Sequence, residues 1–89
     1  MKNLSVLIPT FNDVCVEMVT TLYQQAEALG IGYEILVADD GSTDKAVVEE
    51  NRQINGLSNC RLIEQPVNQC RAAIRNFLAR QAKYPWLVF

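Results

Sequence analysis

Short strand-like runs alternate with helix-like segments along the whole chain. Apolar residues that suit buried strands dominate residues 4–8, 33–38 and 86–89, and a shorter run lies at 61–64. Between these runs, apolar residues recur every three or four positions, the spacing that places them on one face of a helix. This alternation, with connections long enough for right-handed crossovers, predicts a three-layer α/β/α domain with a mostly parallel sheet.

Three helices are expected between these strands, and their ends can be recognised. The first occupies residues 14–29 and stops at Gly30, because glycine readily adopts a left-handed C-cap conformation. The second ends near Ile54, before Asn55 and Gly56, and the third ends before Pro85. The short polar side chains that can cap the first two helices are Asn12, Asp13, Ser42, Thr43 and Asp44.

Composition narrows the class of protein. With 89 residues, of which 49% are hydrophobic, the chain is long enough for one small domain with a buried core. The net charge of −2, without any block of like charges, argues against nucleic acid or an anionic membrane as the main partner. No apolar run approaches the roughly 20 residues that span a bilayer, and the first residues lack the layout of a signal peptide. We therefore expect a cytoplasmic protein.

Cysteine and histidine usage also limits the chemistry. Cys15, Cys60 and Cys70 are odd in number and irregularly spaced, which suits free thiols in a reducing compartment. The sequence contains no histidine, so it supplies neither a Ser-His-Asp triad nor a histidine metal ligand.

Polar clusters follow three successive strands, at residues 9–13, 39–44 and 65–71. In a parallel sheet the carboxyl ends of the strands lie at one edge, where ligands bind. The sequence therefore predicts a binding site formed by these clusters, although Asn12, Ser42 or Asp44 could each be only a helix cap.

Asp39 and Asp40 are the strongest candidates within these clusters. Consecutive strand residues point to opposite faces, so only one of the two carboxylates can face a given pocket. An ionised carboxylate only accepts hydrogen bonds, so it would select a base with a ring N–H, such as uracil, thymine or guanine. Phe11 could stack on that base. Arg71 and Arg75 could reach a diphosphate, or could simply form a solvated helix face.

Three segments together resemble the N-terminal part of family 2 inverting glycosyltransferases, which have the Rossmann-like GT-A fold of nucleotide-diphospho-sugar transferases. They are residues 4–12, 34–44 and 68–76, with the sequences LSVLIPTFN, EILVADDGSTD and NQCRAAIRN. The resemblance runs the length of the chain. It implies transfer of a sugar from a nucleotide-diphosphate sugar, such as a UDP-sugar, to an acceptor hydroxyl. With the alternation of strands and helices, it predicts a four-stranded sheet in the order 3-2-1-4.

The resemblance also implies residue roles. Asp40 would accept the base N–H, Asp39 would support the loop or the ribose, and Arg71 would lie near the base or phosphates. Cys70 stands where the family usually has glycine, so its side chain could crowd the loop or prevent a positive φ angle. The residues that the resemblance assigns to the substrate site are Pro9, Thr10, Phe11, Asn12, Asp39, Asp40, Asn68 and Arg71.

The resemblance places no catalytic residue and no metal ligand within this chain. The family's Asp-x-Asp metal motif would follow a strand like that at 86–89, and its catalytic base would lie further on. We therefore interpret residues 1–89 as the front part of a larger domain, inactive by itself. The full-length enzyme would use Mn²⁺ or Mg²⁺ and act on a glycan, lipid or polysaccharide acceptor. It could also be a peripheral membrane protein.

Other interpretations are less well supported. Nucleotidyltransferases usually have a glycine-rich basic loop after the first strand, and residues 9–13 contain neither glycine nor a basic residue. Receiver domains need acidic residues after the first strand and a phosphoacceptor aspartate after the third. A non-catalytic α/β nucleotide-binding or protein-interaction module remains the alternative. The last strand also leaves an open sheet edge through which chains could self-associate.

Overall fold

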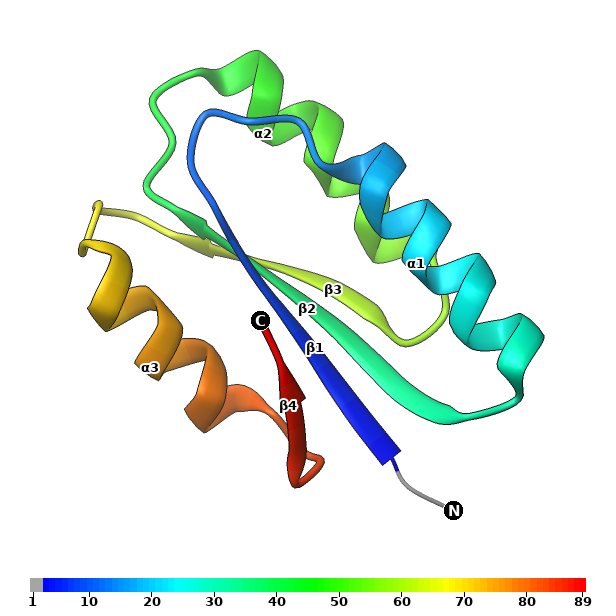
Figure 1. Cartoon of the computed structure of the whole chain (residues 1–89). Helices are drawn as coiled ribbons and strands as arrows, with labels where there is room; N and C mark the ends of the chain where they lie inside the picture. The colour runs from blue at the N-terminus through cyan, green and yellow to red at the C-terminus, as the bar shows by residue number, and fades with distance from the viewer. Residues whose placement is uncertain (1–2) are drawn as a thin grey trace.

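The computed structural model describes residues 3–89 as a sheet with helices on both faces (Figure 1). In chain order the elements are β1 (Asn3–Thr10), α1 (Val16–Leu29), β2 (Gly32–Asp40), α2 (Lys45–Asn51), the 3-10 helix η1 (Arg52–Gly56), β3 (Cys60–Gln65), α3 (Arg71–Gln81) and β4 (Trp86–Val88). This arrangement confirms the predicted α/β class.

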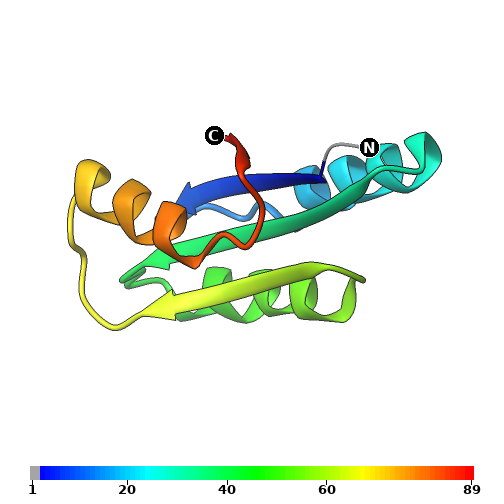
Figure 2. The ribbon, with the colours of Figure 1, turned by 90° about the horizontal axis from the view of Figure 1, so that it is seen from below.

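The strands pair in the order β3-β2-β1-β4, and every pairing is parallel. Both the predicted order and the predicted direction are confirmed. Figure 1 shows α1 and α2 on one face of the sheet and α3 on the other. Figure 2 shows the strands side by side, with β4 on the side of β1 that faces away from β2. All four strands run the same way, so their carboxyl ends share one edge.

The core follows from the alternation of side chains along β2. Ile35 and Val37 belong to a buried cluster with Val19 of α1. Leu36 and Ala38 belong to a second cluster, with Ile74 and Leu78 of α3, on the other face. A parallel strand that is covered on both faces needs apolar residues at consecutive positions, and β2 supplies them.

β1 and β2 continue further than their apolar runs. β1 passes through Pro9, although proline cannot donate a hydrogen bond to a sheet, and pairs with β2 as far as Thr10. β4 pairs with β1 only at residues 4–6, so the missing N–H of proline breaks no bond to β4. β2 likewise includes Asp39 and Asp40 as its last two residues.

The helix ends are partly as predicted. Gly30 adopts a left-handed C-cap with φ of 66°, and Asp44 caps α2 by accepting bonds from two backbone N–H groups. Neither Asn12 nor Asp13 caps α1, which begins at Val16 after Cys15. The backbone N–H of Cys15 instead donates to Asn51 Oδ1 over 2.8 Å. The second helix also changes form, because α2 ends at Asn51 and η1 continues to Gly56.

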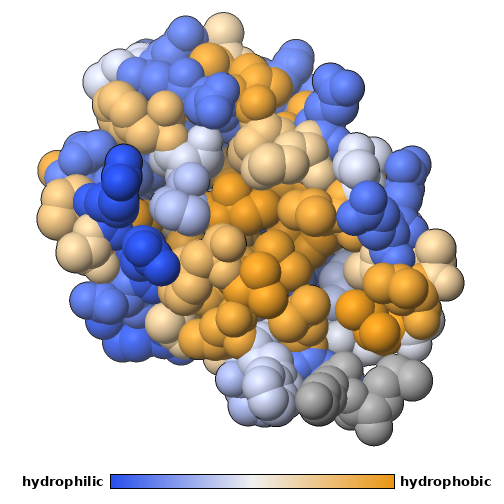
Figure 3. Space-filling view, viewed as in Figure 1, coloured by the Kyte–Doolittle hydropathy of each residue, from blue (hydrophilic) through white to orange (hydrophobic). Residues whose placement is uncertain are grey.

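Apolar side chains cover the centre of the face shown in Figure 3, over β1 and β4. Four consecutive residues contribute to the exposed apolar surface, and their exposed fractions range from 40% to 53%: Trp86, Leu87, Val88 and Phe89. β4 is the end strand of the sheet on this side. Across residues 3–89, none of the helices combines the length and apolar character needed to cross a bilayer.

Candidate functional site

A cavity of about 310 Å³ lies at the carboxyl edge of the sheet. The loops that follow β1 and β3, together with the end of β2 and the start of α3, form its walls. The lining residues are Pro9, Thr10, Phe11, Asp40, Asn68, Cys70, Arg71 and Ile74. Six of the eight residues predicted for the substrate site therefore share one cavity, and the other two, Asn12 and Asp39, are not among its lining residues.

Asp40 is the buried acid of this cavity. Its side chain lies on the α3 face of the sheet, the face to which Ala38 also points. Only 6% of the residue is exposed, and its Oδ1 accepts a 2.8 Å hydrogen bond from the backbone N–H of Gln69. The amide of Asn68 donates to the backbone oxygen of Asp40 over 3.0 Å. The bond from Gln69 offsets part of the cost of burying the carboxylate and fixes its direction, and both bonds join the end of β2 to the loop after β3.

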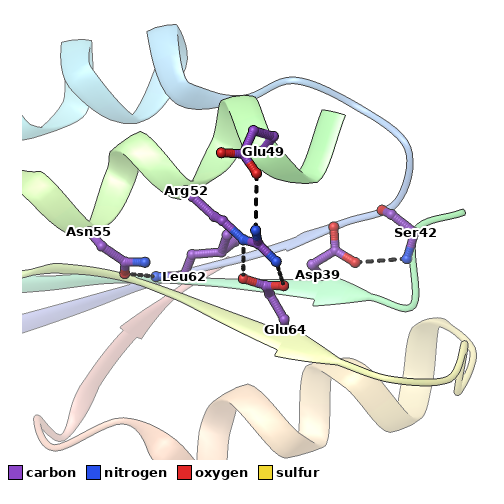
Figure 4. Close-up of polar contacts among 7 residues, drawn as sticks. All are labelled: Asp39, Ser42, Glu49, Arg52, Asn55, Leu62 and Glu64. Carbon is purple, nitrogen blue, oxygen red and sulfur yellow. Dashed lines mark hydrogen bonds and ion pairs between the residues drawn. The ribbon is translucent and has the colours of Figure 1, made fainter. Parts of the chain in front are cut away.

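Asp39 lies on the other face, toward α1 and α2. Its Oδ1 accepts a 2.7 Å bond from the backbone N–H of Ser42, which Figure 4 shows. Its Oδ2 is buried and has no hydrogen-bond partner among residues 3–89. Asp39 therefore supports the turn that follows β2, and it does so from outside the cavity that Asp40 enters.

The loop after β1 contributes an aromatic ring. Phe11 is 47% exposed and lines the cavity, so its ring is accessible to a ligand. Thr10 also lines the cavity, and its hydroxyl donates to the backbone oxygen of Asp13 over 3.1 Å, which shapes the loop. Asn12 bonds to the neighbouring loop at residues 42–44.

The two arginines of α3 have different surroundings. Arg71, the first residue of α3, lines the same cavity as Asp40 and brings a cation to it. Arg75 lines a separate hollow with Phe89, and its guanidinium carbon is 4.4 Å from the centroid of that ring. Arg71 can thus meet an anionic group of a ligand beside Asp40, whereas Arg75 is engaged in a cation–π contact elsewhere.

Cys70 and Ile74 line the cavity but were absent from the predicted set. Cys70 adopts φ of 87° and ψ of 162° in spite of its side chain, so the expectation that it would prevent a positive φ was wrong. The sequence did contain a signal that could have placed Cys70 at the site, because Cys70 replaces the family's usual glycine. Gly41 also has a positive φ of 74°, and a Cβ there would overlap the backbone of Val67 and Asn68. The loop after β3 therefore packs directly on the turn after β2.

Two further sets of side chains lie outside the cavity: the ion pairs of Arg52, and the buried thiols of Cys15 and Cys60. Arg52 bridges Glu49 and Glu64 on the surface beside α2 (Figure 4). The bonds to the Arg52 guanidinium hold the pKa of Glu64 below its usual value. Burial raises the pKa of the Cys60 thiol to about 11, and burial likewise raises the pKa of Cys15, so both stay protonated at neutral pH.

The residues described do not fit a divalent metal ion. Within residues 3–89, no group of three or more acidic, histidine or cysteine side chains is arranged to hold one. Asp39 and Asp40 cannot chelate one ion together, because their carboxylates lie on opposite faces of the sheet.

A parallel α/β sheet with a cavity at its carboxyl edge places this chain among α/β domains that bind ligands at the ends of parallel strands. The sequence model of Glycosyl transferase family 2 matches residues 5–89, and the chain belongs to this family.

Curated relatives agree with this family. This chain is 29% identical to an "Uncharacterized glycosyltransferase" of Haemophilus influenzae, in an alignment of 92 residues that covers 100% of the chain. Over 88 residues, which cover 98% of the chain, it is 32% identical to a chondroitin synthase of Escherichia coli. The chain spans 35% of the first relative's length and 13% of the second's.

Proposed function

We propose that this chain supplies part of the donor nucleotide site of a glycosyltransferase, which transfers a sugar from a nucleotide-diphosphate sugar to an acceptor. One observation carries the proposal: the buried Asp40 carboxylate lies in the same cavity as the exposed Phe11 ring and the Arg71 cation. A hydrogen-bond acceptor, a stacking surface and a cation are the three groups that a base followed by a diphosphate requires.

The three groups have distinct roles in this proposal. Asp40 accepts the ring N–H of the base, which favours uridine over cytidine because cytosine presents a ring acceptor at that position. Phe11 stacks on the base, and Arg71 meets the diphosphate. Pro9, Thr10 and Asn68 also line the cavity, and Asp39 supports the turn after β2 from the other face of the sheet.

We propose that metal binding and catalysis belong to residues other than 1–89 in a full-length enzyme. Residues 3–89 contain no cluster of side chains that fits the Mn²⁺ or Mg²⁺ that the resemblance implies. We propose that this chain alone does not catalyse transfer. A divalent ion in such enzymes neutralises the leaving diphosphate. We propose a glycan, lipid or polysaccharide acceptor. The free cysteines at positions 15, 60 and 70 suit the cytoplasmic location that we propose.

Calorimetric titration of the chain with uridine and cytidine diphosphates tests this function. We expect uridine diphosphate to bind more tightly. A hydrogen bond to a charged group is worth roughly 1.5–3 kcal/mol, so Asp40→Ala should weaken uridine diphosphate binding about ten- to hundredfold. Glu50→Ala, which removes an exposed carboxylate of α2, is the control and should leave binding unchanged. Equal affinity of the wild type for both nucleotides would refute the role of Asp40.

A non-catalytic interaction module is the other candidate. The lack of a metal-binding cluster among the described residues is compatible with it. It predicts that neither nucleotide binds, so the same titration separates the two functions.

A further inference from the structure

Asn12 joins the loop after β1 to the loop after β2 through four hydrogen bonds. Its backbone N–H donates to Ser42 Oγ over 2.8 Å, and its side-chain amide donates to Thr43 Oγ1 over 3.1 Å. Its Oδ1 accepts from the backbone N–H of Thr43 over 2.9 Å and from that of Asp44 over 3.0 Å. Both the main chain and the side chain of Asn12 are therefore committed to the neighbouring loop.

The turn after β2 is itself held by the sheet. Ser42, which accepts the bond from Asn12, donates its own N–H to the buried Asp39 carboxylate. Asp44 is the N-cap of α2, so the far end of the turn is fixed to a helix. Asn12 is thus tied to a firmly anchored segment.

The backbone conformation of Asn12 bears on the position of Phe11, its neighbour in the chain. Asn12 has φ of 51°, a left-handed conformation that asparagine tolerates better than most residues. Phe11 precedes it, is 47% exposed, and lines the same cavity as Asp40. Because so much of the ring is in solvent, packing alone does little to hold it, and the conformation of the next residue gains importance.

We propose that Asn12 is a positioning residue for the nucleotide base: its four bonds to residues 42–44 hold Phe11 at the distance from Asp40 that a base between them requires. This inference rests on the proposed function. Asn12 itself does not touch the nucleotide. Without the bonds, Phe11 would sample several positions, and the ligand would have to order the loop on binding, which lowers affinity.

A double-mutant cycle tests this role, with calorimetric titration of uridine diphosphate as the measurement. Stacking on an aromatic side chain contributes enough that Phe11→Ala should weaken binding about tenfold. Asn12→Ala should weaken it by a similar factor. If Asn12 acts through Phe11, the double variant should bind no more weakly than Phe11→Ala alone.

Conservative variants separate the bonds from the backbone angle. Asn12→Gly permits the positive φ but removes the side-chain bonds, so it should bind as weakly as Asn12→Ala. Asn12→Asp keeps an oxygen that accepts from the N–H groups of Thr43 and Asp44, so it should restore most of the affinity. Amide hydrogen exchange at Thr43 and Asp44 should be slow in the wild type and in Asn12→Asp, and fast in Asn12→Gly.

Asn55 supplies the matched control. Its Oδ1 also accepts a backbone N–H, that of Leu62 over 2.8 Å (Figure 4), but neither residue lines the cavity. Asn55→Ala should lower stability without changing nucleotide affinity. If Asn12→Ala and Phe11→Ala weaken binding independently, the role given to Asn12 is overturned and the nucleotide site stands. If the wild type binds no nucleotide, the proposed function is overturned, and the role of Asn12 with it.

Discussion

The carboxylates of Asp39 and Asp40 lie on opposite faces of the sheet, although the two residues are adjacent. Asp40 enters the cavity and is held by the N–H of Gln69, whereas Asp39 is held by the N–H of Ser42 on the other side. The alternation of a β-strand forces this separation. One acid is thereby available to a ligand while its neighbour secures the turn that both share.

The first prediction concerns Asp39. Asp39→Ala leaves the partly buried N–H of Ser42 without its acceptor, which should lower the free energy of unfolding by about 1–3 kcal/mol. The preference for uridine over cytidine diphosphate should persist, because Asp40 is unchanged. Urea denaturation and calorimetry measure the two effects. Loss of base preference in a stably folded Asp39→Ala variant would show that Asp39 contacts the base.

The second prediction concerns β4. This end strand presents Leu87 with 40% of its surface exposed, so we propose that chains self-associate through it. Leu87→Lys adds a charge to the strand and should weaken association at least about tenfold, as lysine protects natural sheet edges. Sedimentation velocity over a range of concentrations measures this. Leu29→Lys, at an exposed position at the end of α1, should have no effect. A wild-type chain that is monomeric at every concentration contradicts the proposal.

The third prediction concerns pH. The bonds from Arg52 lower the pKa of Glu64, so the folded state favours the ionised carboxylate more than the unfolded state does. This contribution of Glu64 to the free energy of unfolding is fully present above about pH 4.3, the pKa of glutamate in the unfolded chain. It is lost as the pH falls through the lower pKa that Glu64 has in the folded chain. Glu64→Gln should therefore unfold at a slightly lower temperature than the wild type at pH 7. The difference should disappear in thermal melts near pH 3. The effect is small because both side chains are exposed.

A melting difference that grows as the pH falls would contradict this assignment. Glu49→Gln is the control, because Glu49 meets the same guanidinium but is more exposed, at 76% of its side chain. We expect it to change the melting temperature less than Glu64→Gln does.

Local signals predicted much of the fold. The apolar runs located all four strands, Gly30 ended α1, and Asp44 was among the capping residues named for α2. These features depend on a residue and its near neighbours, so they can be recognised in one sequence. The strand order required the family resemblance as well, because alternation alone does not specify which parallel strands are adjacent.

Long-range bonds were not predictable in the same way. The backbone N–H of Cys15 is satisfied by Asn51, 36 positions away, and Asn12 bonds to a loop 30 positions away. An asparagine before a helix has the same appearance whether it caps that helix or joins a distant loop. Six of the eight predicted site residues line the cavity, because they lie at the carboxyl ends of parallel strands or in the segments that follow these ends.

The last prediction concerns the backbone at Cys70. Its φ of 87° and ψ of 162° lie in a region that is essentially restricted to glycine, where a side chain costs about 1–3 kcal/mol. Glycine loses about 0.4–1 kcal/mol more conformational entropy on folding. Cys70→Gly should therefore raise the free energy of unfolding by up to about 2.5 kcal/mol, the largest difference between these two terms. Urea denaturation should show a higher midpoint with an unchanged slope.

Cys70→Ala distinguishes relief of strain from removal of the thiol. Alanine keeps the Cβ that opposes this conformation, so we expect no gain in stability from it. If both variants are stabilised equally, the sulfur atom and not the backbone is responsible. If Cys70→Gly is destabilised, the strain is absent and the thiol contributes contacts that hold the loop.

Because Cys70 lines the cavity beside Arg71, the glycine variant should also bind uridine diphosphate at least as tightly as the wild type, which the same calorimetric titration measures.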